Sequence, residues 1–163
     1  KGYFVFDISN ISLEQLFMAR KALEGTAAYL CARQNMLINL EKLKQLAVLF
    51  RETFQKKYFI HFSMIDQAFH NLIVTSCGNR YIKSMYGEIE RKITYYSVRS
   101  QDYMISLGED PSFAILAGQH IAIYRAIELG MPELAETASK NHLDVCYSLC
   151  LRYHTAMNSM VPY

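Results

Sequence analysis

The sequence predicts an all-α fold, an antiparallel bundle of about six helices. Only 7 glycines and 3 prolines occur among the 163 residues, which argues against the many tight turns of an all-β fold. Apolar residues recur at helical spacing along most of the chain, and the connections between these stretches are short. A chain that is 52% hydrophobic and 20% charged has the composition of a globular domain with a sizeable core.

The first three predicted helices follow from residue 12 onward. The first opens at Ser12, which forms a capping box with Gln15 three residues later. Its apolar stripe consists of Leu13, Leu16, Leu23, Ala27 and Leu30. The second helix carries Leu40, Leu43, Ala47, Phe50 and Phe54. The third contains residues 62–73 and ends near Cys77 and Gly78, because glycine can take the left-handed conformation that closes a helix.

Three more helices complete the predicted bundle. The fourth extends from about Arg80 to Ile105, with these residues inside: Ile82, Met85, Ile89, Ile93 and Tyr96. Asp110 can cap the fifth, and Pro111 suits its first turn. The fifth helix ends at Gly130, and Pro132 opens the sixth. The apolar residues of the sixth are Leu134, Ala135, Ala138, Val145 and Leu149.

Composition excludes several classes of protein. The net charge of +2 is too small to indicate a nucleic-acid surface on this chain. No apolar run approaches the ~18 residues of a membrane span, so we expect no membrane partner. The chain shows no secretory segment, and its four cysteines do not form a dense disulfide framework. We therefore expect a cytoplasmic protein whose cysteines are free thiols.

Polar side chains interrupt the apolar stripes of three predicted helices. In the third helix, Asp66 and His70 lie one turn apart and roughly 40° apart around the helix axis. His120 lies at the centre of the stripe of the fifth helix, and His142 at the centre of that of the sixth. The apolar residues of these three stripes are Phe62, Ile65, Phe69 and Leu72; Phe113, Leu116, Ile123 and Ile127; and Ala135, Ala138, Val145 and Leu149.

These polar residues suggest a metal site. A single buried histidine is usually a hydrogen-bonded core residue, but three in separate stripes together with a carboxylate call for a common explanation. A buried carboxylate without a partner costs several kcal/mol. A divalent cation would satisfy all four side chains, and its ligands would be Asp66, His70, His120 and His142. Imidazole nitrogen and carboxylate oxygen suit zinc or nickel, with iron or manganese as alternatives.

A rival arrangement lies on the sixth helix. His142, Cys146, Cys150 and His154 form an unbroken row at i, i+4 spacing, and thiolates and imidazoles are zinc ligands. Each step drifts by roughly 40°, so one ion could use two neighbours of this row but not four. We interpret the cysteines as small core residues, and we expect His61 and His154 to be surface or packing residues.

Arg20 occupies the slot of the first stripe between Leu16 and Leu23. It can form an ion pair with Glu24 at i+4. It can also direct its guanidinium into the bundle, where it would bind a carboxylate ligand in bidentate fashion. Both interpretations are open at this point.

The order and spacing of these residues resemble the FCD domain, the effector-binding C-terminal domain of the FadR branch of GntR-type bacterial transcription regulators. The family pattern D-x-x-F-H corresponds to Asp66–His70, and its small-Gly-Asn turn to Ser76–Asn79. The H-x-x-I-x-x-A-I-x-x-G pattern corresponds to His120–Gly130, the last histidine to His142, and R-x-x-L-E to Arg20–Glu24. The resemblance extends from about residue 12 onward.

The resemblance implies a site and a domain organisation. Asp66, His70, His120 and His142 are then metal ligands beside a cavity for a small organic acid. Arg20 is the first candidate for binding that acid, and Asn79 and Arg99 are weaker ones. Residues 1–7 resemble the end of the wing strand of an N-terminal winged helix-turn-helix domain that contacts DNA, and residues 8–163 form the FCD-like domain.

The function expected from this resemblance is regulatory and not enzymatic. The domain would bind a divalent metal and a small carboxylate effector, and the effector would modulate operator binding through a homodimer. The alternatives are a helical metal-dependent hydrolase, which would need a general base near the metal, and an interaction domain whose metal is structural only.

Overall fold

A computed structural model describes residues 10–34, 37–55, 62–106 and 111–159. These residues form six α-helices and no strand, as the sequence predicts. The helices are α1 (Asn10–Arg33), α2 (Leu40–Gln55), α3 (Phe62–Ser76), α4 (Arg80–Ser106), α5 (Pro111–Glu128) and α6 (Pro132–Ser159). None of the helices in these ranges is long and apolar enough to cross a membrane.

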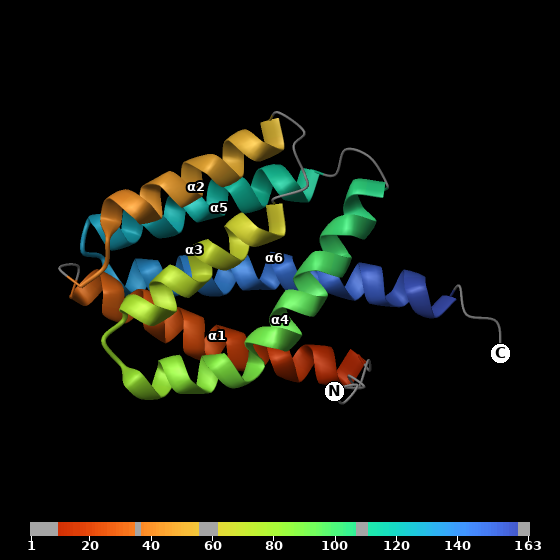
Figure 1. Cartoon of the computed structure of the whole chain (residues 1–163), viewed down its shortest axis with the longest axis horizontal. Helices are drawn as coiled ribbons and strands as arrows, with labels where there is room; N and C mark the ends of the chain where they lie inside the picture. The colour runs from red at the N-terminus through yellow and green to blue at the C-terminus, as the bar shows by residue number, and fades with distance from the viewer. Residues whose placement is uncertain (1–9, 35–36, 56–61, 107–110, 160–163) are drawn as a thin grey trace, which may run out of the picture.

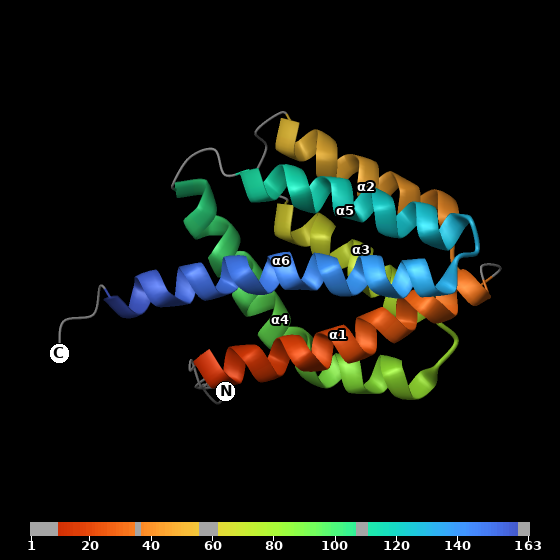
Figure 2. The same cartoon turned by 180° about the vertical axis from the view of Figure 1, so that it is seen from behind.

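The helices form an antiparallel bundle, in which each runs roughly opposite to the one before it (Figure 1). α6 passes along the bundle and packs against α1, α4 and α5 (Figure 2). α3 contacts α1, α2 and α4, and α2 also packs on α5. α4 crosses α3 and α6 obliquely. Residues of α1, α3, α5 and α6 therefore meet in the interior.

Turn residues close the helices as predicted. Gly78 has a φ of 72° after α3, and Gly130 has a φ of 63° after α5. At Gly130 the backbone N–H bonds to the carbonyl of Ile127 (3.1 Å) and that of Met131 to the carbonyl of Ala126 (2.9 Å). These two bonds make a Schellman motif with glycine at its left-handed position. Pro111 and Pro132 open α5 and α6, where a missing N–H costs nothing.

Three predicted details differ in the structure. α1 begins at Asn10, so Ser12 lies inside the first turn and is not the N-cap of the predicted capping box. Met85 is 58% exposed, and Tyr86 is buried in its place, because the buried series of α4 alternates four- and three-residue steps from Ile82. Leu134 is exposed because its neighbour Ala135 faces the core, and adjacent helical residues point about 100° apart.

Some predicted features lie outside the described residues. They are the extended stretch at residues 1–7, the N-cap Asp110, His61 and the side chain of Phe54.

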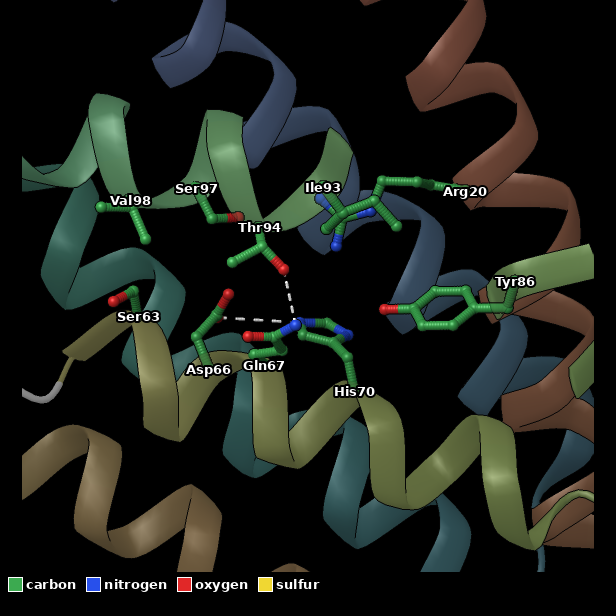
Figure 3. Close-up of a pocket in the computed structure, with 10 residues that line it drawn as sticks. All are labelled: Arg20, Ser63, Asp66, Gln67, His70, Tyr86, Ile93, Thr94, Ser97 and Val98. Carbon is green, nitrogen blue, oxygen red and sulfur yellow. Dashed lines mark hydrogen bonds and ion pairs between the residues drawn. The ribbon is translucent and has the colours of Figure 1, made fainter. Parts of the chain in front are cut away.

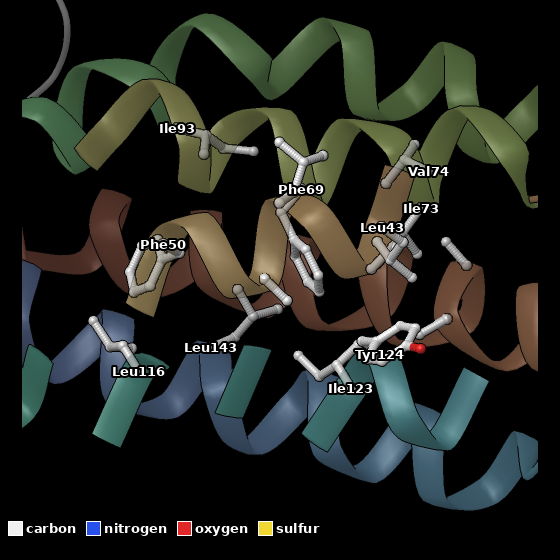
Figure 4. Close-up of a cluster of buried hydrophobic side chains, with 14 of the residues drawn as sticks. Leu43, Phe50, Phe69, Ile73, Val74, Ile93, Leu116, Ile123, Tyr124 and Leu143 are labelled. Atoms are coloured by element: carbon white, nitrogen blue, oxygen red, sulfur yellow. The ribbon is translucent and has the colours of Figure 1, made fainter. Parts of the chain in front are cut away.

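Among the described residues, the core is largely apolar and contains four fully buried phenylalanines. They are Phe50 of α2, Phe62 and Phe69 of α3, and Phe113 of α5. The rings of Phe50 and Phe62 pack with centroids 4.0 Å apart, and those of Phe62 and Phe113 4.9 Å apart. Figure 4 shows Phe50 and Phe69 among aliphatic side chains from α2, α5 and α6. This packing surrounds the buried polar residues with an environment that excludes water.

Replacing Gly118 in the middle of α5 and Gly130 just after that helix by alanine should have opposite effects on stability. Gly130→Ala should lower the free energy of unfolding by about 1 kcal/mol, because a Cβ is strained at its positive φ. Gly118→Ala should raise it by about 0.5–1 kcal/mol, because Gly118 is exposed within α5 and a Cβ there meets nothing within 4 Å. Urea unfolding measures both, and equal effects would contradict the assigned conformation of Gly130.

Candidate metal centre

Four side chains predicted as metal ligands converge inside the bundle. α3 contributes Asp66 and His70, α5 contributes His120, and α6 contributes His142. One donor atom of each lies within 4.8 Å of the others, and all four side chains are buried. The sequence could not show that three helices meet at one point, and the structure shows that they do.

The donor atoms are close together, and some of them lack hydrogen-bond partners. His70 Nε2 lies 3.1 Å from His142 Nε2, and His120 Nε2 lies 3.2 Å from Asp66 Oδ1. The Asp66 carboxylate and His70 lie side by side on α3, with 3.7 Å between Oδ1 and Nε2 (Figure 3). Neither ring nitrogen of His120 has a hydrogen-bond partner of adequate geometry among the described residues, and neither has Nδ1 of His142. Buried nitrogens without partners are costly, and a cation among them would relieve that cost. The residues present thus fit a divalent metal.

Aromatic rings isolate this cluster from water. The edges of the Phe50 and Phe69 rings face His120, with centroid distances of 4.2 and 4.5 Å. His120 and His142 are fully buried. An apolar surround of this kind strengthens electrostatic interactions at the centre, because little solvent screens them.

A second carboxylate, that of Glu24 on α1, contacts Nδ1 of His70, the ring nitrogen on the side away from the cluster. His70 Nδ1 lies 2.8 Å from Glu24 Oε2, so its N–H donates to the carboxylate and Nε2 is the ring nitrogen that faces the cluster. Arg20 Nε donates to Glu24 Oε1 at 2.6 Å, and both side chains are 2% exposed. Arg20 therefore forms the predicted ion pair with Glu24 and lies inside the bundle, whereas its binding of a carboxylate ligand stays a prediction.

Charges in the cluster follow from burial and from close neighbours. Burial alone would raise the pKa of Asp66, but the imidazoles of His120 and His70 beside it hold that pKa well below its usual range. Burial opposes the charge on His70, yet the carboxylates of Glu24 and Asp66 raise its pKa to about 9. Burial lowers the pKa of His120 and, together with the neighbouring imidazoles, lowers that of His142 further. At neutral pH the metal-free cluster thus contains an anionic Asp66, a cationic His70 and two neutral imidazoles.

A narrow hollow adjoins the cluster between α3, α4 and α1 (Figure 3). Arg20, Asp66 and His70 line it together with Tyr86, and its other residues are Ser63, Gln67, Ile93, Thr94, Ser97 and Val98. The Tyr86 hydroxyl points into the hollow, is buried, and has no hydrogen-bond partner in the described part of the chain. The space available holds roughly one water molecule in this conformation.

Two predicted effector-binding residues lie elsewhere. The Asn79 side chain caps α4, since its Oδ1 accepts from the backbone N–H groups of Tyr81 (3.0 Å) and Ile82 (3.2 Å). Arg99 is exposed, with its guanidinium carbon 6.0 Å from the centre of the Tyr95 ring. Neither residue lines the hollow beside the cluster. Arg20 is the one predicted effector-binding residue that does.

The rival row on α6 separates into two halves. Cys146 Sγ lies 3.4 Å from His142 Nε2, whereas Cys150 Sγ lies 3.4 Å from Ser100 Oγ. All four cysteines of the chain are free, and three of them are buried. His154 is buried, so of the two alternatives predicted for it the packing role is correct.

Two residues of the site were not identified from the sequence. Glu24 was not identified as a partner of His70, although its position one turn after Arg20 places it on the buried face of α1. Tyr86 was missed because Met85 was predicted to face the core in its place, although Tyr86 lies one turn after the buried Ile82. Helical spacing alone could have indicated that Glu24 and Tyr86 are buried. It could not have indicated which residues of other helices they contact.

Comparison with known families supports the resemblance drawn from the motifs. The family model described as the FCD domain matches residues 15–145. The chain belongs to the FCD domain family. FCD domains are the ligand-sensing regulatory domains of GntR-type transcription regulators and are not enzymes. A search of curated proteins gave no match for this FCD domain.

Replacing His142 by leucine should stabilise the FCD domain when metal is absent. The variant removes a buried imidazole whose Nδ1 has no partner among the described residues, and His70 Nε2, which loses His142 Nε2, keeps Asp66 beside it, so the free energy of unfolding should rise by about 1–3 kcal/mol. Below about pH 6.5 the unfolded chain protonates His142 while the fold keeps it neutral, so the wild-type protein also loses stability as the pH falls. His142→Leu should lessen that loss. Urea unfolding of chelator-treated protein at about pH 7.5 and about pH 5.5 measures both effects.

Zinc provides the control for this variant. Saturating zinc should stabilise the wild-type domain more than His142→Leu and reverse their order, because a ligand that binds the folded state stabilises it. A metal-free variant that is less stable than wild type at both pH values would contradict this account of His142.

Proposed function

We propose that this FCD domain senses a small organic acid beside a divalent metal and transmits its binding to a DNA-binding domain. The metal ligands are Asp66, His70, His120 and His142, and the metal is zinc or nickel, with iron or manganese as alternatives. The observation that carries the proposal is the meeting of four buried donors from three helices, with imidazole nitrogens that lack partners. A regulator of this kind acts in the cytoplasm, where its operator lies.

The protein supplies a site that is already oriented for a metal. Glu24 fixes the ring of His70, and the phenylalanines around His120 limit its movement. When bound, the metal supplies a concentrated positive charge at the wall of the hollow. That charge attracts an anionic ligand, and the protein residues decide which anion fits.

Arg20 and Tyr86 define the chemistry of that ligand. The guanidinium of Arg20 lines the hollow and has donors that its two bonds to Glu24, from Nε and Nη2, do not use. The Tyr86 hydroxyl can donate to a second oxygen, and the hydroxyls of Ser63 and Ser97 lie on the same wall. A small carboxylic acid with a further polar oxygen is the ligand class that would satisfy these groups.

The small size of the hollow links binding to a change of structure. An organic acid is larger than a water molecule, so it can enter only when α4 or the side chains lining the hollow move away from α3. α1 carries Arg20 and Glu24, and in the proposed domain order it directly follows the DNA-binding domain that ends at residues 1–7. Displacement of α1 would thus change the position of the DNA-binding domains in a homodimer.

The four-ligand site can be tested by removing its ligands. Asp66→Ala combined with His142→Ala should leave the domain without metal and lower its melting temperature, as should the milder Asp66→Asn to a smaller extent. Asp144→Ala is the control, because Asp144 is an exposed carboxylate on α6 that pairs with Lys21. Elemental analysis measures the metal, and circular dichroism verifies the fold. Full metal retention in the double variant would refute the site.

Metal uptake by the wild-type domain should release protons. The pKa of His70 is about 9 without metal, so at about pH 7.5 its proton must leave before Nε2 can bind a metal. Titration calorimetry in buffers of different ionisation enthalpy should show at least about one proton released per metal. Affinity should therefore fall as the pH is lowered, and pH-independent binding without proton release would contradict the role of His70.

The proposed role of Arg20 in binding the acid can be tested separately from the metal site. Arg20→Ala should weaken binding of a small carboxylic acid at least about tenfold, because the lost guanidinium contacts are charge-assisted. Arg99→Ala is the matched control, since Arg99 is an exposed arginine outside the hollow and should leave affinity unchanged. Both variants are tested with saturating metal against a panel of small acids by calorimetry. If no acid binds the metal-loaded wild type, the metal is structural and the sensing proposal fails.

A further inference from the structure

Cys146 lies next to the candidate metal centre and is not used by the function proposed above. It follows His142 by one turn on α6, and its Sγ lies 3.4 Å from His142 Nε2. The cysteine is close enough to Asp66 for that carboxylate, after burial, to contribute to raising the pKa of the thiol. The sulfur therefore lies at the edge of the donor cluster itself.

A second observation shows that the cluster is built for a ligand. His120 is 0% exposed, lies within the same group of donors, and has no hydrogen-bond partner for either ring nitrogen among the described residues. Cys146 is thus not an isolated thiol. It borders a site whose buried polar atoms lack partners.

Two separations, from His70 to His142 and from His142 to Cys146, match those of ligands that share one ion. Metal–nitrogen bonds are about 2.0–2.1 Å long and metal–sulfur bonds about 2.3 Å. When two ligands make an angle of about 90° to 109° at the metal, two nitrogens lie about 2.9–3.4 Å apart. A nitrogen and a sulfur then lie about 3.1–3.6 Å apart. The observed distances are 3.1 Å between His70 Nε2 and His142 Nε2 and 3.4 Å between His142 Nε2 and Cys146 Sγ.

A hydrogen bond from the thiol to His142 is a weaker explanation. His142 Nε2 has one lone pair, and His70 Nε2 already faces it at 3.1 Å. The thiol and His70 therefore compete for one acceptor, and His70 Nε2 is the nearer of the two, at 3.1 Å against 3.4 Å for the sulfur. A metal ion removes this competition, since each donor then directs its own lone pair at the ion.

We propose that Cys146 is a fifth metal ligand and that its sulfur selects a thiophilic metal for this site. The inference rests on the proposed function, in which Asp66 and the three histidines bind a metal. As the sulfur–metal bond forms, the thiol proton passes to solvent and the thiolate becomes the ligand. A sulfur ligand favours zinc, nickel or cobalt, and disfavours manganese and magnesium, which prefer oxygen.

The structure also explains why one cysteine of the α6 row takes this role and the next does not. Cys150 is one turn further along, and its sulfur faces Ser100 Oγ at 3.4 Å and the Tyr96 carbonyl at 3.9 Å. The drift of each helical step turns Cys150 away from the cluster, to which His142 belongs and beside which Cys146 lies, 3.4 Å from His142 Nε2. Cys150 is therefore a matched control, with the same side chain on the same helix.

Cobalt(II) gives a direct readout, because a thiolate bound to it produces a charge-transfer band in the near ultraviolet. The reduced wild-type domain loaded with cobalt should show this band together with d–d bands in the visible. Cys146→Ser should lose the charge-transfer band and keep the d–d bands, and Cys150→Ser should keep both. Competition titrations should show that Cys146→Ser loses at least about tenfold more affinity for zinc than for manganese.

The outcomes separate this inference from the function on which it rests. A wild-type spectrum with d–d bands and no charge-transfer band would overturn the role of Cys146 and leave the Asp66 and histidine site intact. A band that survives in Cys146→Ser but disappears in Cys150→Ser would overturn it as well. A wild-type domain that binds neither cobalt nor zinc would overturn both proposals.

Discussion

The need to balance two carboxylates inside a helical bundle determines much of this structure. Asp66 and Glu24 are almost completely buried, and an uncompensated charge at such a position costs several kcal/mol. Arg20 compensates Glu24 from the same helix, and His70 lies between both carboxylates, facing Glu24 with Nδ1 and the cluster with Nε2. The fixed orientation of His70 and the register of α1 against α3 both follow from this arrangement.

Local sequence rules account for the helices and for the candidate ligands. Glycine and proline positions gave the boundaries at Gly78, Pro111, Gly130 and Pro132, because backbone conformation at these residues depends little on distant contacts. Asp66, His120 and His142 could be selected because each interrupts an apolar stripe, and a helix of known periodicity shows which face a residue occupies. These inferences required no knowledge of how the helices pack.

Contacts between helices could not be predicted in this way. The bond from His70 to Glu24 joins α3 to α1, and it depends on the rotation and height of two helices 46 residues apart in sequence (70 − 24). Met85 and Tyr86 are adjacent, so they point about 100° apart around the axis of α4. Which of the two faces the core depends on how α4 is rotated against its neighbours, and a rotation smaller than that angle decides it. An asparagine can bind a ligand, but Asn79 immediately precedes α4, and its side chain accepts hydrogen bonds from the first backbone N–H groups of that helix.

The formal charges of the site connect the metal, the acid and the cysteine. Without metal, the charges on Asp66, Glu24, Arg20 and protonated His70 sum to zero, because −1 − 1 + 1 + 1 = 0. A divalent ion that replaces the His70 proton leaves an excess of one positive charge, since −1 − 1 + 1 + 2 = +1. In so apolar an interior, one further anion is favoured and a second is costly. If metal, acid and Cys146 bind as proposed, the thiolate and the carboxylate of the acid would compete for this positive charge, and binding of the acid would weaken the bond between Cys146 and the metal. Such competition would connect occupancy of the hollow to α6, which packs against α1 and α4 along the bundle.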